Sequence, residues 1–499
     1  MTWVDPRMIV SPLWRTRLVM IGASALAFWF GAGLAQQDYF WPMLIAGGLT
    51  MLALSRLFRL PIDVILLGLT LFGYIAGNRG FAQISLLNRF PLLPAEFVLL
   101  VAGVTLLVKS AFSRMLPVRR EILNVAILGW MCICGVRLAF DLQTFGFLAL
   151  RDFATVYYAA FFFIAQSIAQ GGRNRQWLHR CLIAGFCGMM VLHPLVEYFP
   201  GFFLDTLTVR GNPVIYFKGD LVGTMLVAGA ILVFHRLEKR NLPLAVGASL
   251  IMTAVGLTTN NRASLVAVGS AMVLLLWGRR WRFAATQSIA GVVAVVGILF
   301  FAYLTNTSWR QTPLHGVYER VVSIVDVAGE RHYSGEDTYY KGDNNRFRMV
   351  WWHAVVKETM DANPWFGLGF GADLASRFVS EYYPEQGEEF DTRSPHNVML
   401  TLLGRAGLAG LLPLLLITSL ITRRIYRAAH THDPSLGTWC AAWVILISAC
   451  FGVVLEGPMG AVVFWSALGL ASAETQTAPV EISLDAPESL PNAGPSASV

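Results

Sequence analysis

Charged residues are scarce in this sequence of 499 residues. Asp, Glu, Lys and Arg make up 14% of it, whereas a soluble domain carries roughly a quarter. So few charges leave too little polar surface to cover a soluble globule, and the mean hydropathy is +0.56. The composition therefore excludes an ordinary soluble domain and indicates a protein of the lipid bilayer.

Cysteine is also sparse, and motifs for metals or nucleotides are lacking. The cysteines lie inside apolar stretches, as small buried side chains do, with neither disulfide nor metal-site spacing: Cys132, Cys134, Cys181, Cys187, Cys440 and Cys450. No H-x-E or H-E-x-x-H spacing, no phosphate-binding glycine loop and no Ser-His-Asp order occurs. The sequence thus predicts neither a metal site nor a cofactor.

What the sequence does contain is a series of long apolar stretches. Many are near 20 residues, the length that a helix needs to cross roughly 30 Å of hydrocarbon, whereas barrel strands would be about half as long and would alternate in polarity. This pattern predicts an all-α polytopic integral membrane protein with about 12–14 transmembrane helices. The first stretch has no A-x-A site after it and is expected to remain as a helix. The expected spans lie near 18–35, 39–54, 60–76, 91–108, 122–140, 153–169, 178–199, 214–235, 242–258, 263–278, 283–304, 396–421, 437–455 and 458–473.

The net charge of +7 reflects orientation in the membrane rather than nucleic-acid binding. Basic clusters fall on alternate connections, which the positive-inside rule makes cytoplasmic: Arg15/Arg17, Arg56/Arg59, Arg114/Arg119/Arg120, Arg173/Arg175/Arg180, Arg236/Lys239/Arg240, Arg279/Arg280/Arg282 and Arg423/Arg424/Arg427. Both termini are then cytoplasmic, and a large loop before the last spans is external. We expect a transmembrane bundle over 1–304, the loop over 305–395, the C-terminal spans over 396–473 and a disordered tail over 474–499.

The external loop contains an amphipathic segment, NNRFRMVWWHAVVKETMDANPW. Asn344 or Asn345 is expected to cap the helix, and Asn363–Pro364 to end it before the turn GLGFGAD. Aromatic residues on one side and basic residues on the other suit a helix at the membrane surface. The apolar positions at helical spacing are Phe347, Val350, Trp351, Ala354 and Val355, and the basic ones are Arg346, Arg348 and Lys357.

The segment SPHNVMLTLLGRAGLAG opens the next span. In one continuous helix, His396, Gly407 and Gly410 share a face with Leu400 and Leu403, and the two glycines let another helix approach closely. His396 then stands at the external mouth of that face, although a histidine can also merely finish a helix start. Arg405 lies about 180° around the same helix and is not expected to share the pocket.

Further charged residues lie on the external side or within the membrane. Arg262 opens a span after the short turn TTNNRAS, and the alternative is a snorkelling arginine at a helix end. Arg210, Lys218 and Asp220 are secondary candidates, because ionisable groups in a bilayer are functional candidates by default, although Lys218 and Asp220 could simply pair. Several arginines and one histidine at one surface suit a pyrophosphate. Guanidinium groups bind phosphate oxygens bidentately, and an imidazole can orient or deprotonate a hydroxyl.

These residues resemble a known family. RFRMVWWHAVVKETMDANPWFGLGFG followed by SPHNVMLTLLGRAGLAG is similar to the signature of the O-antigen ligase and O-antigen polymerase superfamily, and TTNNRAS is similar to its T-x-S-R segment. The similarity covers roughly residues 250–420. In ligase members an acid usually stands in the place of Arg405, and many members have about twelve spans, so the likeness is to the superfamily rather than to a lipopolysaccharide ligase in particular.

The resemblance implies a metal-independent, inverting glycosyltransferase at the periplasmic face of the bacterial inner membrane. It implies an undecaprenyl-diphosphate-linked glycan as donor and lipid A-core, another carrier-linked glycan of a surface or exopolysaccharide, or in some members a protein as acceptor. Carried over by position, Arg262 and Arg348 hold the donor diphosphate, with Arg346 as the alternative to Arg348, and His396 serves the acceptor hydroxyl. No cofactor is implied.

Two other classes stay open on the sequence alone. A lipid-linked oligosaccharide flippase or other transporter also has many spans, although transporters usually show paired interrupted helices with charges near the midplane. Here the charges gather at the outer face beside one asymmetric loop, which favours the enzyme. A non-enzymatic subunit of an envelope assembly is the third class, because a sequence does not show turnover.

Overall fold

The computed structural model describes residues 40–85, 93–113, 118–209, 211–259, 261–331, 333, 341–382 and 392–475. The expected first span near 18–35, Arg210 and the expected tail beyond residue 475 lie outside the described residues. Within these ranges regular structure is almost wholly helical, and the strands are limited to the short antiparallel pair β1 (Thr208–Val209) and β2 (Asn212–Pro213).

Helices follow one another along the chain with short connections. They are α2 (Phe40–Phe58), α3 (Ile62–Ala76), α4 (Asn78–Ala82), α5 (Pro94–Ser113), α6 (Ile122–Phe145), α7 (Phe147–Asp152), α8 (Ala154–Tyr157), α9 (Ala160–Ile168), α10 (Gly172–Tyr198), η2 (Gly201–Thr206), α11 (Gly219–Leu237), α12 (Leu242–Thr258), α13 (Arg262–Trp277), α14 (Trp281–Leu304), η3 (Trp309–Gln311), α15 (Pro313–Val325), α16 (Lys341–Ala362), α17 (Ser376–Tyr382), α18 (Val398–His430), α19 (Leu436–Ala449) and α20 (Pro458–Thr475). Each expected span from residue 39 onward overlaps one of these helices or a run of them, although α19 ends at Ala449, before the expected end at 455.

Among the described residues, seven helical stretches are long and apolar enough to cross a membrane, and eight if α2 and α3, bent by 107°, form one span. The stretch over Phe147–Ile168 combines α7, α8 and α9. α12, α13 and α19 are apolar but shorter. The prediction of an all-α polytopic membrane protein is therefore confirmed.

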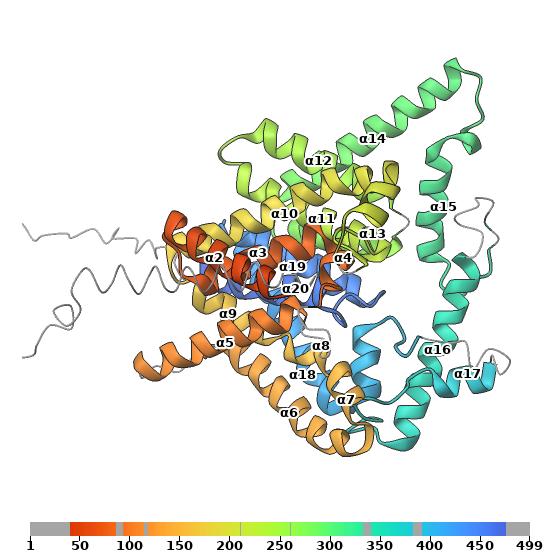
Figure 1. Cartoon of the computed structure of the whole chain (residues 1–499). Coiled ribbons are helices and arrows are strands. Elements are labelled where there is room, and N and C mark those ends of the chain that lie inside the picture. The colour runs from red at the N-terminus through yellow and green to blue at the C-terminus, as the bar shows by residue number, and fades with distance from the viewer. Residues whose placement is uncertain are drawn as a thin grey trace, which may run out of the picture.

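The core of the bundle lies around α11, α19 and α20, whose residues are almost all buried. Figure 1 shows α19 and α20 at the centre, with the earlier helices around them. Close approach depends on small residues. Gly469 of α20 lies so near α9 that an added Cβ would clash with the Phe162 carbonyl. α14, by contrast, exposes apolar side chains along its length, such as Val292 and Phe300, as a helix that faces lipid does.

Helix α18 is broken at Gly407, which corrects the expectation of one continuous helix with a single small-residue face. Gly407 has φ 62° and ψ −159°, and His396 precedes the helix rather than sharing its face. The break arises because the backbone around it bonds to the turn after α16: Leu368 N to Gly404 O at 2.7 Å, Gly369 N to Arg405 O at 3.1 Å, Leu408 N to Pro364 O at 2.9 Å and Ala409 N to Trp365 O at 3.0 Å. Gly410 still permits a close approach, since the Trp130 indole of α6 donates to its carbonyl at 3.1 Å.

Two helices run across one end of the bundle. Figure 1 shows α15 and α16 lying roughly crosswise to α14, at the right-hand side of the view. α15 is attached to the bundle through Arg320, which donates to Leu257 O at 2.7 Å and to Thr259 O at 3.0 Å. α16 buries Trp351 and Val355 against α17 and the preceding turn.

The start of α16 differs from the expected one. The helix begins at Lys341, before the asparagines that were expected to cap it. The Asn345 amide instead donates to Ser323 O at 2.8 Å and to Asp326 O at 2.7 Å, which ties α16 to the end of α15. The expected end is confirmed, because α16 stops at Ala362 and the Asn363 side chain accepts a bond from Phe366 N at 3.0 Å.

Candidate functional site

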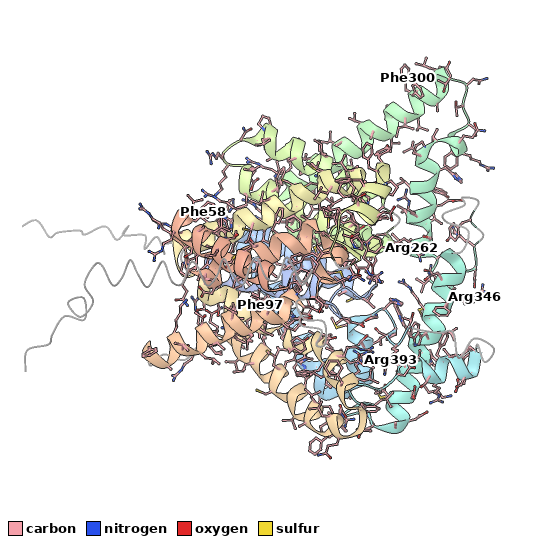
Figure 2. The ribbon with its side chains drawn as sticks, in the orientation of Figure 1. Phe58, Phe97, Arg262, Phe300, Arg346 and Arg393 are labelled. Carbon is pink, nitrogen blue, oxygen red and sulfur yellow. The ribbon has the colours of Figure 1, made fainter. Side chains whose placement is uncertain are left out.

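A cavity of about 510 Å³ lies between α11, α13, α15 and α16. Its polar lining comes from Asp220, Asn261, Arg262, Ser323, Asn344, Asn345 and Arg348, and its remaining lining from Gly219, Ala263, Val266, Ile324, Val327, Met349, Trp352 and Phe451. The structure thus brings together Arg262 and Arg348, which lie far apart in the sequence (Figure 2 labels Arg262 at this end of the bundle).

The two arginines reach the cavity from fixed helices. Asn261 caps α13 by accepting a bond from Ala263 N at 2.9 Å, so Arg262 occupies the first helical position. The Asn261 amide also donates to the carbonyl of Asp220, and this bond joins the starts of α13 and α11. Gly223 allows this junction, because an added Cβ would lie 2.6 Å from the Thr259 hydroxyl.

In the part of the chain that the structure describes, neither arginine forms an ion pair with a carboxylate. Arg262 Nη1 lies 3.4 Å from Ser323 O, and Arg348 Nη1 donates to Phe451 O at 2.9 Å. Burial lowers the pKa of Arg348, while Asp220 opposes this shift, and a guanidinium stays charged at neutral pH. Most donors of both groups therefore remain able to bind an anion in the cavity.

Lys218 and Asp220 form an ion pair at 3.1 Å beside these arginines. Asp220 lines the cavity, whereas Lys218 lies next to it with its backbone N–H bonded to Asn78 Oδ1 at 3.0 Å. The pair leaves little net charge, so the two arginines determine the positive character of the cavity. Lys218 and Asp220 therefore pair with each other, which is the alternative that the sequence left open.

Arg346, the alternative to Arg348, points elsewhere. It is exposed, and its Nη2 donates to Gly329 O at 2.9 Å, after the end of α15. It does not line the cavity, and Figure 2 shows it on the outer helix, across from Arg262. The rotation of α16 therefore favours Arg348 as the residue that faces Arg262.

His396 lies beside the cavity rather than in its wall. Its backbone has φ 54°, in the left-handed region, and the neighbouring carbonyl of Pro395 accepts a bond from the Trp352 indole at 2.7 Å. Asn397 then caps α18 through Met399 N at 3.0 Å and Leu400 N at 3.3 Å. The imidazole meets the Trp351 ring edge-on, with 6.0 Å between centroids.

The environment keeps the His396 imidazole neutral. Burial lowers its pKa, and the positive charge of Arg348 lowers it further, while Glu456 acts in the opposite direction. A neutral ring can accept a proton, which an imidazolium cannot. The group next to the arginines is thus suited to take a proton from a hydroxyl.

Arg405 lies outside the cavity, as expected. Arg405 is buried and pairs with Asp152 at 3.2 Å, so it does not line the cavity.

Glu456, in the connection between α19 and α20, lies near His396 and did not stand out among the sequence motifs. The signal that could have identified it is its isolation, since it is the sole charged residue between Asp433 and Glu474. Among the described residues, no group of three or more His, Cys, Asp or Glu side chains is arranged to hold a metal ion.

One end of this helical membrane bundle thus holds a cavity lined by two arginines, with a histidine beside it. Residues 247–415 match the family model described as O-antigen ligase. The match covers about a third of the chain, includes Arg262, Arg348 and His396, and confirms the resemblance to the O-antigen ligase and polymerase superfamily. It supports glycan transfer of that general type, with lipid-linked glycans as substrates, in a bacterial membrane. A search of curated proteins found no match.

Proposed function

We propose that this protein transfers a glycan from an undecaprenyl-diphosphate carrier to an acceptor hydroxyl at the periplasmic face of the inner membrane. The observation that carries the proposal is the meeting of Arg262 and Arg348 in one cavity with His396 beside it. A diphosphate diester carries one negative charge on each phosphate, and two guanidinium groups match it. The acceptor is lipid A-core, as in a ligase, or a carrier-linked glycan, as in a polymerase of surface or exopolysaccharide repeats.

The reaction is a single displacement at the anomeric carbon. The acceptor oxygen forms the new glycosidic bond, and the bond between the anomeric carbon and the diphosphate oxygen breaks with its electron pair going to undecaprenyl diphosphate. Arg262 and Arg348 stabilise the charge on this leaving group. His396 takes the hydroxyl proton and later releases it to water. One displacement inverts the anomeric configuration, and the two guanidinium groups supply the positive charge without a metal ion.

The composition of the cavity walls supports a lipid-linked donor. The lining combines polar side chains, namely Arg262, Arg348 and the asparagines, with the apolar side chains Val266, Ile324 and Val327. A diphosphate and the first part of a polyprenyl chain need these two environments side by side. Val325 and Val327, which follow Ile324 along the chain, are exposed, and the polyprenyl chain would leave the cavity past them.

Release of the carrier tests the proposal and separates an enzyme from a flippase. The purified protein in detergent is incubated with a lipid-linked glycan and an acceptor, and free undecaprenyl diphosphate and the glycosylated acceptor are both quantified. We expect the two products in equal amounts. A protein that binds the donor but releases no undecaprenyl diphosphate would be a transporter or an assembly subunit.

A topology measurement tests the proposed side of the membrane. The arginine clusters predict that the 305–395 segment is periplasmic and that both termini are cytoplasmic. A periplasm-dependent reporter at residue 340 should therefore be active. Activity of a cytoplasm-dependent reporter at that position would overturn both the topology and the location of the site.

A further inference from the structure

We propose that Glu456 is a positioning residue for the transfer reaction, which holds the turn that carries His396. This inference rests on the proposed function and extends it to a segment outside the family match, which ends at residue 415. It concerns the connection 450–457 between α19 and α20.

The connection lies between the two halves of the site. α19 ends at Ala449 although apolar residues continue to Leu455, and residues 451–457 are not helical. At one end, the Phe451 carbonyl accepts the bond from Arg348 Nη1 at 2.9 Å. At the other end, Glu456 contacts the turn that precedes α18. One short segment therefore contacts both the donor-binding arginine and the support of the histidine.

The Glu456 carboxylate binds two hydroxyl groups on either side of His396. Its Oε1 accepts bonds from Ser394 Oγ and from Thr401 Oγ1, the latter at 3.0 Å, and the two hydroxyl oxygens lie 3.1 Å apart. Ser394 is 6% exposed and Thr401 is fully buried. Buried hydroxyls need partners, so loss of the carboxylate leaves this network incomplete.

The His396 backbone depends on such support. A residue other than glycine with φ 54° occupies a sparsely populated conformation, which persists only when its surroundings hold it. Three contacts do so: Glu456 holds Ser394, Trp352 holds the Pro395 carbonyl and Asn397 caps the helix. Removal of the first contact lets the turn relax and moves the imidazole away from the acceptor hydroxyl.

The same carboxylate also acts on the protonation of His396. The charged groups that face the ring are Arg348 from α16, Lys218 and Asp220 from the start of α11, and Glu456 from the connection. Arg348 and Lys218 lower the pKa of His396, whereas Glu456 and Asp220 raise it. Neutralising Glu456 therefore lowers this pKa further. Because the neutral ring is the active form, the acid limb of the pH–rate profile then moves to lower pH.

The test compares Glu456→Gln with a double variant, Ser394→Ala/Thr401→Val, which keeps the charge but removes both hydroxyls. We expect kcat of Glu456→Gln at pH 7 to fall about tenfold, because misplacement of a reacting group is costly, with the donor KM within about twofold of wild type. Its acid limb should move to lower pH. The double variant should lose a similar part of kcat while its acid limb stays in place. The matched control is Glu381→Gln, an exposed carboxylate on α17 whose change should have no effect.

Wild-type kcat and an unmoved acid limb in correctly folded Glu456→Gln would overturn the inference. If that variant does not fold, the double variant decides, and a kcat within about twofold of wild type would refute the role. The proposed function fails separately. In that case the wild-type protein itself releases no undecaprenyl diphosphate.

Discussion

Replacing Arg348 by lysine keeps a positive charge at the cavity but removes the planar fork. In the structure, one Nη1 donor of Arg348 is bound to Phe451 O at 2.9 Å, and the other donors remain for a ligand. A lysine ammonium is a point charge and cannot bridge two phosphate oxygens while it also reaches that carbonyl. Arg348→Lys therefore loses at least one charge-assisted hydrogen bond to the diphosphate.

The size of the effect follows from that bond. A hydrogen bond to a charged group contributes about 1.5–3 kcal/mol, so its loss in the transition state lowers kcat/KM roughly 10- to 150-fold. The assay is the initial rate of undecaprenyl diphosphate release at subsaturating donor. Arg346→Lys, two residues along α16, tests the orientation of the helix, and Arg310→Lys on the exposed η3 is the control.

We expect Arg346→Lys to retain most activity, because its guanidinium binds the Gly329 carbonyl outside the cavity. Full activity of Arg348→Lys would refute the diphosphate role of that residue. Loss of activity in Arg346→Lys with a normal Arg348→Lys would mean that α16 is rotated when the donor binds. Unchanged expression of both variants is the condition for either conclusion.

Three further predictions concern the histidine and the broken helix. His396→Ala should abolish or strongly reduce transfer while carrier-lipid binding stays nearly intact; wild-type activity should fall only below pH 6.5, because the pKa of His396 is lowered, and a fall that begins above pH 6.5 would contradict this role of the histidine. Arg405→Ala removes the buried partner of Asp152 Oδ2 and leaves this carboxylate only Arg151 at its other oxygen, so it should cost about 1–3 kcal/mol of stability, measured as a lower Tm, whereas an unchanged Tm would contradict the buried pair. Gly407→Ala forces a Cβ into the Trp365 carbonyl at positive φ, and should destabilise by about 2–4 kcal/mol in the same assay, while Gly291→Ala on the exposed part of α14, where no atom lies near, should not.

The helices and the main residues of the site could be predicted from the hydropathy and the motif order of the sequence. Apolar stretches locate the helices because each must cover its own length of hydrocarbon, and the order of the motifs anticipates that Arg262 and Arg348 meet. The choice between Arg346 and Arg348 depends on how α16 is rotated, which is determined by the packing of Trp351 against α17 and by the bonds of Asn345 to the end of α15. Those partners are distant in the sequence, so periodicity alone does not select the residue.

The break in α18 was not predictable for a different reason. Helical periodicity assumes that each carbonyl bonds within the helix, but the carbonyls of Gly404 and Arg405 bond to the turn after α16 instead. Glu456 was not predicted because it stands alone in the short connection between the expected spans 437–455 and 458–473, and because its partners Ser394 and Thr401 lie some sixty positions away. In both places, tertiary contacts override a local pattern.

The bonds across the Gly407 break attach one end of α16 to the bundle through the backbone. The far end of α16 is fixed by the backbone bonds between 364–369 and 404–409, and each group that they satisfy would cost several kcal/mol if left bare in a membrane. α15 is attached to the bundle by side chains, because Arg320 donates to Leu257 O and Thr259 O, and Arg262 Nη1 lies 3.4 Å from Ser323 O. One helix that lines the cavity, α15, is therefore held by side-chain contacts, whereas the far end of the other, α16, is held by backbone bonds.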